Sequence, residues 1–169
     1  DRQVYLDKLA AGGVEWVRLD ISWAMVQPSG PNSYDMGWGV PRIDKRIEEI
    51  AARGMKTLML FYQTPAWASD AGTLNATPRN PEQFADAAAW VAARYGNKLA
   101  AMEIWNEPDL ADFLASKSPT DYTNLVKAAY PKVKAANPNL TVVAGAPTYT
   151  NTNWYSQFFA KGGADHHDA

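Results

Sequence analysis

Residues 101–109 read Ala-Met-Glu-Ile-Trp-Asn-Glu-Pro-Asp, and this stretch decides the fold. It predicts a short apolar strand. Pro108 cannot donate to a sheet ladder, so we expect strand pairing to stop there. Asn106 and Glu107 would then lie at the carboxyl end of the strand, which is where parallel α/β sheets and barrels bind ligands. The stretch therefore marks the place where we expect the chemistry.

The alternation of side chains along this strand brings two carboxyls to one face. Met102 and Ile104 are expected to face one side of the sheet, and Glu103, Trp105 and Glu107 the other. A partly buried carboxyl beside an aromatic ring tends to have a raised pKa, and it can then act as a general acid near neutral pH. Position alone leaves a second interpretation equally open, in which Glu107 only caps the following loop.

Strand and helix patterns alternate along the rest of the chain. Besides the central stretch, strands are predicted at residues 14–20, 56–62 and 140–146, and helices at residues 2–11, 41–53, 80–95, 118–136 and 153–160. Residues 21–40 are expected to form a long loop. This alternation predicts one α/β domain with a parallel sheet.

The composition excludes several classes of function. The chain has 18 acidic and 16 basic residues, a net charge of -2 and no basic run, so we expect neither a nucleic-acid nor a membrane partner. No apolar run is long enough to span a membrane. Cysteine is absent, which excludes disulfides and thiolate metal sites. His166 and His167 have no third ligand nearby, so we expect no metal and no cofactor.

The central motif resembles a known family. Glu-Ile-Trp-Asn-Glu-Pro-Asp closely resembles the acid/base signature of clan A glycoside hydrolases, (β/α)8 enzymes in which Asn-Glu-Pro closes the fourth barrel strand. The resemblance implies that Glu107 is the general acid/base and that Asn106 hydrogen-bonds the sugar 2-hydroxyl. Trp-Val-Arg-Leu-Asp at residues 16–20 and Thr-Pro-Ala-Trp-Ala at residues 64–68 add to it, and together they look most like β-glycosidases of family 39 and family 5.

Arg18 is expected on the inner face of the first strand, where an arginine needs an anion. In clan A enzymes an arginine on the second barrel strand supports the catalytic carboxylates, and Arg18 is similar in placement. A structural pair between Arg18 and Glu103 is an equally good interpretation, and both can hold together.

Several residues are expected to line the substrate site. Tyr62, Gln63 and Trp67 leave the second strand beside the Asn-Glu pair, and Trp67 is the candidate sugar platform. The alternative for Trp67 is that it anchors its own loop. Trp23, in the loop after the first strand, is expected to line a further subsite.

Three more residues complete the expected substrate-binding set. Asp20 shares the inner face of its strand with Arg18, Trp105 precedes the Asn-Glu pair, and Asp109 follows it.

The four predicted strands are too few for a whole barrel, which needs eight. If Asn-Glu closes the fourth strand, the chain is a single partial TIM barrel domain holding strands two to five. The nucleophilic glutamate of the resembled family lies on the seventh strand, so no residue here fills that role.

The resulting prediction is a retaining β-glycoside hydrolase, cellulase-like or xylosidase-like, that acts on a carbohydrate substrate as part of a longer protein. We expect that protein to be bacterial, and secreted or associated with the cell envelope. The alternative is an inactive carbohydrate-binding half-barrel, which would pair with the missing half or with another copy of the chain.

Overall fold

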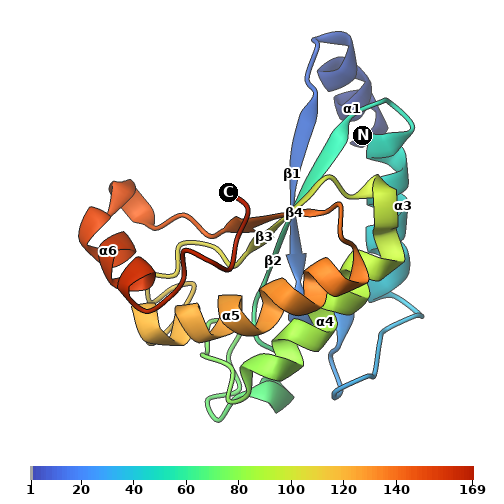
Figure 1. The fold of residues 1–169 in the computed structure, drawn as a ribbon. Helices are drawn as coiled ribbons and strands as arrows, with labels where there is room; N and C mark the ends of the chain where they lie inside the picture. The colour runs from blue at the N-terminus through green and yellow to red at the C-terminus, as the bar shows by residue number, and fades with distance from the viewer. Residues whose placement is uncertain (1) are drawn as a thin grey trace.

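The computed structural model describes residues 2–169 and contains one sheet of four parallel strands (Figure 1). The strands follow the chain in the order β1-β2-β3-β4, each hydrogen-bonded to the next. Their bounds are β1 Trp16–Ser22, β2 Lys56–Tyr62, β3 Ala101–Ile104 and β4 Thr141–Ala144. The predicted parallel α/β arrangement is thereby confirmed.

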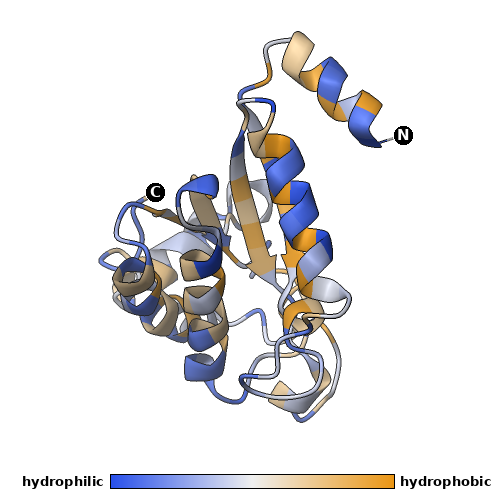
Figure 2. Cartoon of the chain, turned by 90° about the vertical axis from the view of Figure 1, so that its right-hand side faces the viewer, coloured by the Kyte–Doolittle hydropathy of each residue, from blue (hydrophilic) through white to orange (hydrophobic). Residues whose placement is uncertain are grey.

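Helices connect the strands and cover the outer face of the sheet. The α-helices are α1 Arg2–Ala11, α2 Trp23–Val26, α3 Gly39–Ala51, α4 Pro81–Tyr95, α5 Pro119–Ala136 and α6 Thr152–Ala160. Short 3-10 turns are η1 Ala66–Ala68, η2 Gly96–Lys98 and η3 Thr148–Thr150. Figure 2 shows hydrophilic and hydrophobic residues alternating along α3, next to strands that are mainly hydrophobic.

The core lies between the sheet and the helices α3, α4 and α5. Phe61, Met102 and Ile104 point from the strands into one buried cluster with Phe84 of α4 and Leu125 of α5. All five side chains are almost completely buried. Burial of this apolar surface is the main source of stability, and it leaves the opposite face of the sheet available for polar side chains.

The predicted starts of α4 and α5 are confirmed, because each is encoded locally. The helix α3 begins at Gly39, two residues before the predicted Pro41. Asn80 caps α4 by accepting a hydrogen bond from the Glu82 amide at 3.0 Å, and Pro81 occupies the first turn. Ser118 caps α5 in the same way through Asp121, at 3.2 Å. Asp35 accepts three backbone amide hydrogen bonds at the start of α3. These bonds lower the pKa of its carboxyl, and the bond from the Gly39 amide has the largest effect.

Some predicted boundaries were wrong. The first strand begins at Trp16 rather than at residue 14, and the loop predicted at residues 21–40 contains the short helix α2. Strand β3 ends at Ile104, three residues earlier than expected, because Trp105 has a φ of 70° and leaves the extended conformation.

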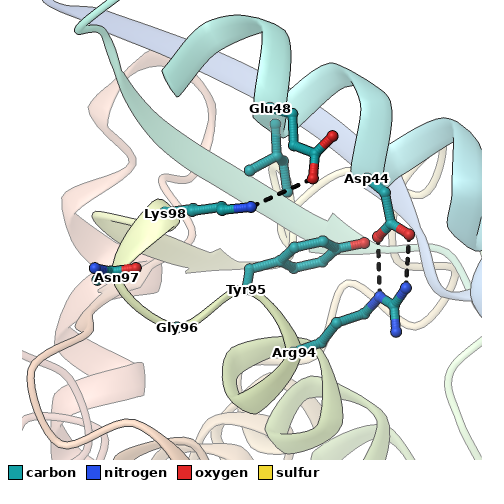
Figure 3. A pocket seen from close by; sticks show the side chains of 8 residues that line it. Asp44, Glu48, Arg94, Tyr95, Gly96, Asn97 and Lys98 are labelled. Atoms are coloured by element: carbon teal, nitrogen blue, oxygen red, sulfur yellow. Dashed lines mark hydrogen bonds and ion pairs between the residues drawn. The ribbon is translucent and has the colours of Figure 1, made fainter. Parts of the chain in front are cut away.

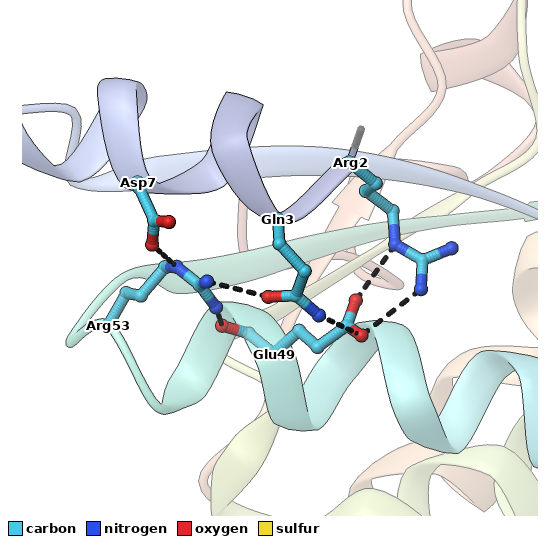
Figure 4. Close-up of polar contacts among 5 residues, drawn as sticks. All are labelled: Arg2, Gln3, Asp7, Glu49 and Arg53. Carbon is cyan, nitrogen blue, oxygen red and sulfur yellow. Dashed lines mark hydrogen bonds and ion pairs between the residues drawn. The ribbon is translucent and has the colours of Figure 1, made fainter.

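A group of polar contacts holds α1 against α3 (Figure 4). Arg2 forms a two-pronged ion pair with Glu49, with distances of 2.8 and 3.1 Å, and Gln3 also donates to Glu49. Arg53 of the following turn binds Asp7 at 2.8 Å. The contacts fix the first helix of the described chain beside the amino-terminal end of the sheet.

The last residues of the chain extend the sheet beyond β4. The Asp168 and Ala169 amides donate to the Val142 carbonyl at 2.8 and 3.3 Å, and the Ala144 amide donates to the Ala169 carbonyl at 2.8 Å. This is the hydrogen-bond pattern of a parallel pair. Across residues 2–169, no helix is both long and apolar enough to cross a membrane.

Candidate active site

Arg18 and Glu103 form an ion pair on the inner face of the sheet. Arg18 Nε lies 2.7 Å from Glu103 Oε2, and Arg18 Nη2 lies 3.1 Å from Glu103 Oε1. The pair reaches across β2, from β1 to β3. Glu103 is almost fully buried, and its hydrogen bond raises the pKa of the Arg18 guanidinium. The interpretation that Arg18 pairs with Glu103 is confirmed.

The same guanidinium also binds two other site residues. Arg18 Nη2 donates to Asn106 Oδ1 at 2.9 Å, and Arg18 Nη1 lies 3.5 Å from Asp20 Oδ1. A planar guanidinium with five donors can bind both oxygens of one carboxylate and further acceptors in the same plane, a geometry that a lysine ammonium does not offer. Arg18 therefore brings together side chains from β1, from β3 and from the turn after β3.

Glu107 lies next to this cluster on a strained turn. Its φ is 36°, and the φ of Trp105 and that of Gln63 are both 70°. Left-handed backbone is uncommon for residues other than glycine, and such strain gathers at functional sites. The Glu107 side chain is half-buried, and its carboxyl has no hydrogen bond or ion pair with any residue from 2 to 169.

The strained turn is held by Tyr122 of α5 and by Gly145, which follows β4. The Tyr122 hydroxyl donates to the Ile104 carbonyl at 2.8 Å and accepts a hydrogen bond from the Gly145 amide. A Cβ at position 145 would lie 2.6 Å from the Trp105 carbonyl oxygen, so only glycine fits there. Complete burial raises the pKa of Tyr122, so the hydroxyl keeps its proton and remains a donor.

The predicted substrate contacts of Trp105 and Trp23 are wrong, because both rings are completely buried. The Trp105 indole turns into the core between sheet and helices and donates to the Phe113 carbonyl at 2.9 Å. The Trp23 indole donates to Gln27 Oε1 at 2.7 Å and packs edge-on against Phe84. Both tryptophans are part of the core.

Trp67 is anchored on its polar edge. Its indole donates to the Gln27 carbonyl at 2.7 Å, and its ring packs edge-on against Trp23 with 5.5 Å between centroids. These contacts favour the alternative in which Trp67 anchors its loop, although the ring is only half-buried.

Tyr62 and Gln63 lie at the carboxyl end of β2, as expected. Tyr62 is half-buried, and burial, followed by the nearby Asp20 carboxylate, raises the pKa of its hydroxyl. With Phe113, both residues line a small hollow of about 70 Å³. Tyr62 is thus the aromatic side chain that shares the inner face with the Arg18 cluster.

Asp109 has a different role from the predicted one. Its Oδ1 accepts from the Thr148 amide at 2.9 Å, and its Oδ2 accepts from the Thr148 hydroxyl at 2.9 Å and the Asn151 amide group at 3.2 Å. Both oxygens are therefore occupied by the loop after β4. The predicted substrate contact of Asp109 is replaced by a structural link between two loops.

The sequence interpretation named Glu103 as an inner-face carboxyl and as a partner for Arg18, and the structure agrees. It missed one residue of this region. Tyr155 of α6 carried no recognisable signal. Burial raises the pKa of its hydroxyl, and the nearby Glu103 and Asp109 carboxylates raise it further, which places α6 close to the cluster.

A larger hollow lies elsewhere, between α3 and the end of α4 (Figure 3). It has a volume of about 460 Å³. Its charged side chains neutralise each other, since Arg94 binds Asp44 at 2.9 and 2.6 Å and Lys98 lies 3.3 Å from Glu48. It is therefore not a candidate catalytic site. No group of three potential metal ligands occurs in the described part of the chain.

The sequence matches the model of the Cellulase family, glycosyl hydrolase family 5, over residues 1–164. No curated protein sequence matches the chain.

Solved structures match the fold. A family 39 glycoside hydrolase from Bacteroides cellulosilyticus WH2 aligns with a TM-score of 0.79 and 23% identity, over 100% of this chain and 34% of that one. The endoglucanase Cel5A of Thermotoga maritima aligns with a TM-score of 0.70 and 19% identity, over 92% of this chain and 47% of that one. The catalytic domain of the family 30 xylanase C from Talaromyces cellulolyticus gives a TM-score of 0.68 and 14% identity, over 90% of this chain and 42% of that one.

The chain thus spans between a third and a half of the length of these proteins. The predicted resemblance to clan A glycoside hydrolases and the predicted partial barrel are both confirmed. The chain belongs to the Cellulase family, glycosyl hydrolase family 5, and forms four adjacent parallel strands of a (β/α)8 barrel.

Proposed function

We propose that this chain is the acid/base half of a retaining β-glycoside hydrolase that acts on a β-linked oligo- or polysaccharide. Glu107 protonates the glycosidic oxygen as the bond breaks, and the resulting carboxylate then activates water in the second step. Asn106 binds the 2-hydroxyl of the sugar at the cleaved bond. Arg18 holds Asn106 in place.

The observation that carries the proposal is the hydrogen bond from Arg18 to Asn106. Because a cationic donor occupies Asn106 Oδ1 at 2.9 Å, the orientation of the amide is fixed. The Nδ2 group makes no hydrogen bond within residues 2–169 and is left to donate to a ligand. An amide N–H held in advance by a guanidinium is suited to a sugar hydroxyl, since little entropy is lost when the ligand arrives.

The surroundings of Glu107 suit a proton donor. It follows Asn106 directly, at the carboxyl edge of the sheet, and no arginine or lysine within the described chain forms an ion pair with it. An ion pair would hold the carboxyl in its charged form and oppose its protonation. These surroundings support the acid/base role proposed for Glu107.

The nucleophile is assigned to a part of the barrel outside these 169 residues. A retaining enzyme needs two carboxyls about 5 to 5.5 Å apart. Glu103 is bound by Arg18, and Asp109 is bound by the loop after β4. Neither can attack a sugar without losing the contacts that hold the site together.

The test is a Glu107→Gln variant of the full-length protein, assayed on aryl β-glycosides with good and poor leaving groups. We expect kcat/KM to fall on the order of 10²- to 10⁴-fold for poor leaving groups, which need a proton, and much less for activated ones. The matched control is Glu15→Gln, because Glu15 is exposed before β1 at the opposite end of the sheet.

Equal losses on both substrate types would remove Glu107 from the acid role. Binding of β-linked oligosaccharides by the full-length protein without any hydrolysis would favour the alternative, a carbohydrate-binding half-barrel without turnover.

A further inference from the structure

The loop after β4 carries an aromatic ring that is completely exposed. Tyr149 has a relative exposure of 102%, and it makes no ring contact with another aromatic side chain or with a cation among the described residues. By contrast, the exposed Trp38 is covered by the Arg42 guanidinium, 4.1 Å from the ring centroid, and the exposed Phe159 stacks on Tyr155. Tyr149 therefore presents both faces of its ring to solvent.

The backbone that presents this ring is strained. Tyr149 has a φ of 49° and a ψ of 31°, and the φ of Thr150 is 53°. Two successive left-handed residues without glycine are unfavourable, and for the β-branched threonine such a φ is a clear outlier. Backbone of this kind persists only where surrounding contacts hold it.

Asp109 supplies these contacts. Its carboxylate binds Thr148 and Asn151, the residues on both sides of the strained pair, at distances between 2.9 and 3.2 Å. Asn151 in turn caps α6 by accepting from the Trp154 amide at 3.2 Å. The tip of the loop is therefore fixed at both of its ends, and Tyr149 is its most exposed residue.

Asp109 also fixes where the tip lies. It is two residues after Glu107, so their Cα atoms are at most about 7 Å apart. Asn151, the cap of α6, binds the Asp109 carboxylate at 3.2 Å, so the start of α6 lies near the same carboxylate. The loop tip that carries Tyr149 thus lies beside the residues that follow Glu107, on the β4 side of the candidate active site.

We propose that Tyr149 stacks on a sugar unit next to the cleaved bond and that Asp109 positions it there. Pyranose rings have apolar C–H faces, and an exposed aromatic ring gains from covering such a face. A rigid loop reduces the entropy that binding would otherwise cost. This inference rests on the proposed function, and it adds a contact that determines which chain lengths are preferred.

The experiment uses the full-length protein with Glu107→Gln, so that ligands are not cleaved, and titrates it calorimetrically with cello-oligosaccharides of increasing length. In this background, Tyr149→Ala is expected to weaken binding of the longer ligands about tenfold and to change that of the shortest by less than about twofold. Tyr149→Phe, which keeps the ring, is expected to restore the affinity. Tyr5→Ala is the matched control, because Tyr5 is an exposed tyrosine on α1.

Asp109→Asn tests the positioning role. It should reproduce the length-dependent loss of Tyr149→Ala, and the double variant should lose no more than either single variant, because both remove the same contact. Additive losses of affinity would show that Asp109 acts independently of the ring, and would overturn its positioning role.

Unchanged affinity of Tyr149→Ala for every ligand would overturn the stacking role and leave the assignment of Glu107 intact. Unchanged affinity together with a lowered Tm would make Tyr149 a packing contact with the rest of the barrel. If the parent Glu107→Gln protein bound no cello-oligosaccharide while wild type hydrolysed aryl β-glycosides, this inference would be rejected and the proposed function would stand. If wild type hydrolysed no β-glycoside, both would be rejected.

Discussion

A single guanidinium organises the candidate site at the scale of residues. Arg18 binds Glu103, Asn106 and Asp20, which lie up to 88 positions away in the sequence. Removing it would release Asn106 and leave the carboxylate of Glu103 buried without a partner, which is costly. Its two roles, in folding and in orienting Asn106, can be separated by choosing the substitution.

Arg18→Lys keeps the positive charge but removes the planar guanidinium. An ammonium group cannot bind both Glu103 oxygens and Asn106 in one plane. In the full-length protein we expect kcat/KM to fall about 10- to 100-fold with a change in Tm of only a few degrees. Activity assays and thermal unfolding measure the two effects. Arg42→Lys is the control, since that guanidinium stacks on Trp38 outside the site.

Arg18→Ala is expected to lower the free energy of unfolding by about 1–3 kcal/mol, a value reduced because the Arg18 side chain is 42% exposed. Adding Glu103→Gln should recover part of this loss, because no unpaired carboxylate then remains. If the double variant lost the sum of the unfolding free energies lost by Arg18→Ala and by Glu103→Gln alone, the ion pair would contribute nothing to the fold.

At the scale of elements, the end of β3 depends on its neighbour β4. The Tyr122 hydroxyl fills the gap between the Ile104 carbonyl and the Gly145 amide, where the two strands separate. Tyr122→Phe keeps the ring and leaves both buried backbone groups without this partner. We expect a loss of about 1–3 kcal/mol in the free energy of unfolding, measured by urea denaturation.

The matched control is Tyr130→Phe on the same helix, whose hydroxyl donates to Asp168 at 2.8 Å near the surface. Its loss should be clearly smaller than that of Tyr122→Phe, because water replaces the exposed bond. Equal losses for the two variants would mean that Tyr122 contributes only through its ring.

The same junction explains what the sequence could and could not predict. The starts of α4 and α5 were predictable because Asn80 and Ser118 act on amides two or three residues away. The early end of β3 was not, because the left-handed turn at Trp105 depends on close approach to Gly145, forty residues later. Burial of the Trp105 indole follows from that turn, so its substrate role could not be judged from alternation alone.

At the scale of the whole molecule, the motif around Glu107 was enough to predict the family and the partial barrel, because the sheet topology follows from the alternation of strands and helices. The site was predicted less completely. Arg18, Asn106 and Glu107 are brought together as expected, whereas Asp109 and Trp23 have structural roles that depend on loops distant in sequence.

The open side of the sheet is the remaining consequence of a partial barrel. Strand β1 pairs only with β2 among residues 2–169, and of its seven residues only Ile21 is buried. Trp16 is 47% exposed at the same edge. An exposed strand edge with apolar side chains promotes association with other chains.

Residues 1–169 produced alone are therefore expected to self-associate and to hydrolyse no aryl β-glycoside that the full-length protein cleaves. Association follows from the uncovered β1 edge, and inactivity follows because the proposed nucleophile is assigned to a part of the barrel outside these residues. Light scattering at several concentrations measures the first effect, and the glycosidase assay measures the second. Turnover by the fragment that disappears in its Glu107→Gln variant would show that a nucleophile lies within these residues. Turnover that persists in that variant would count against Glu107 itself.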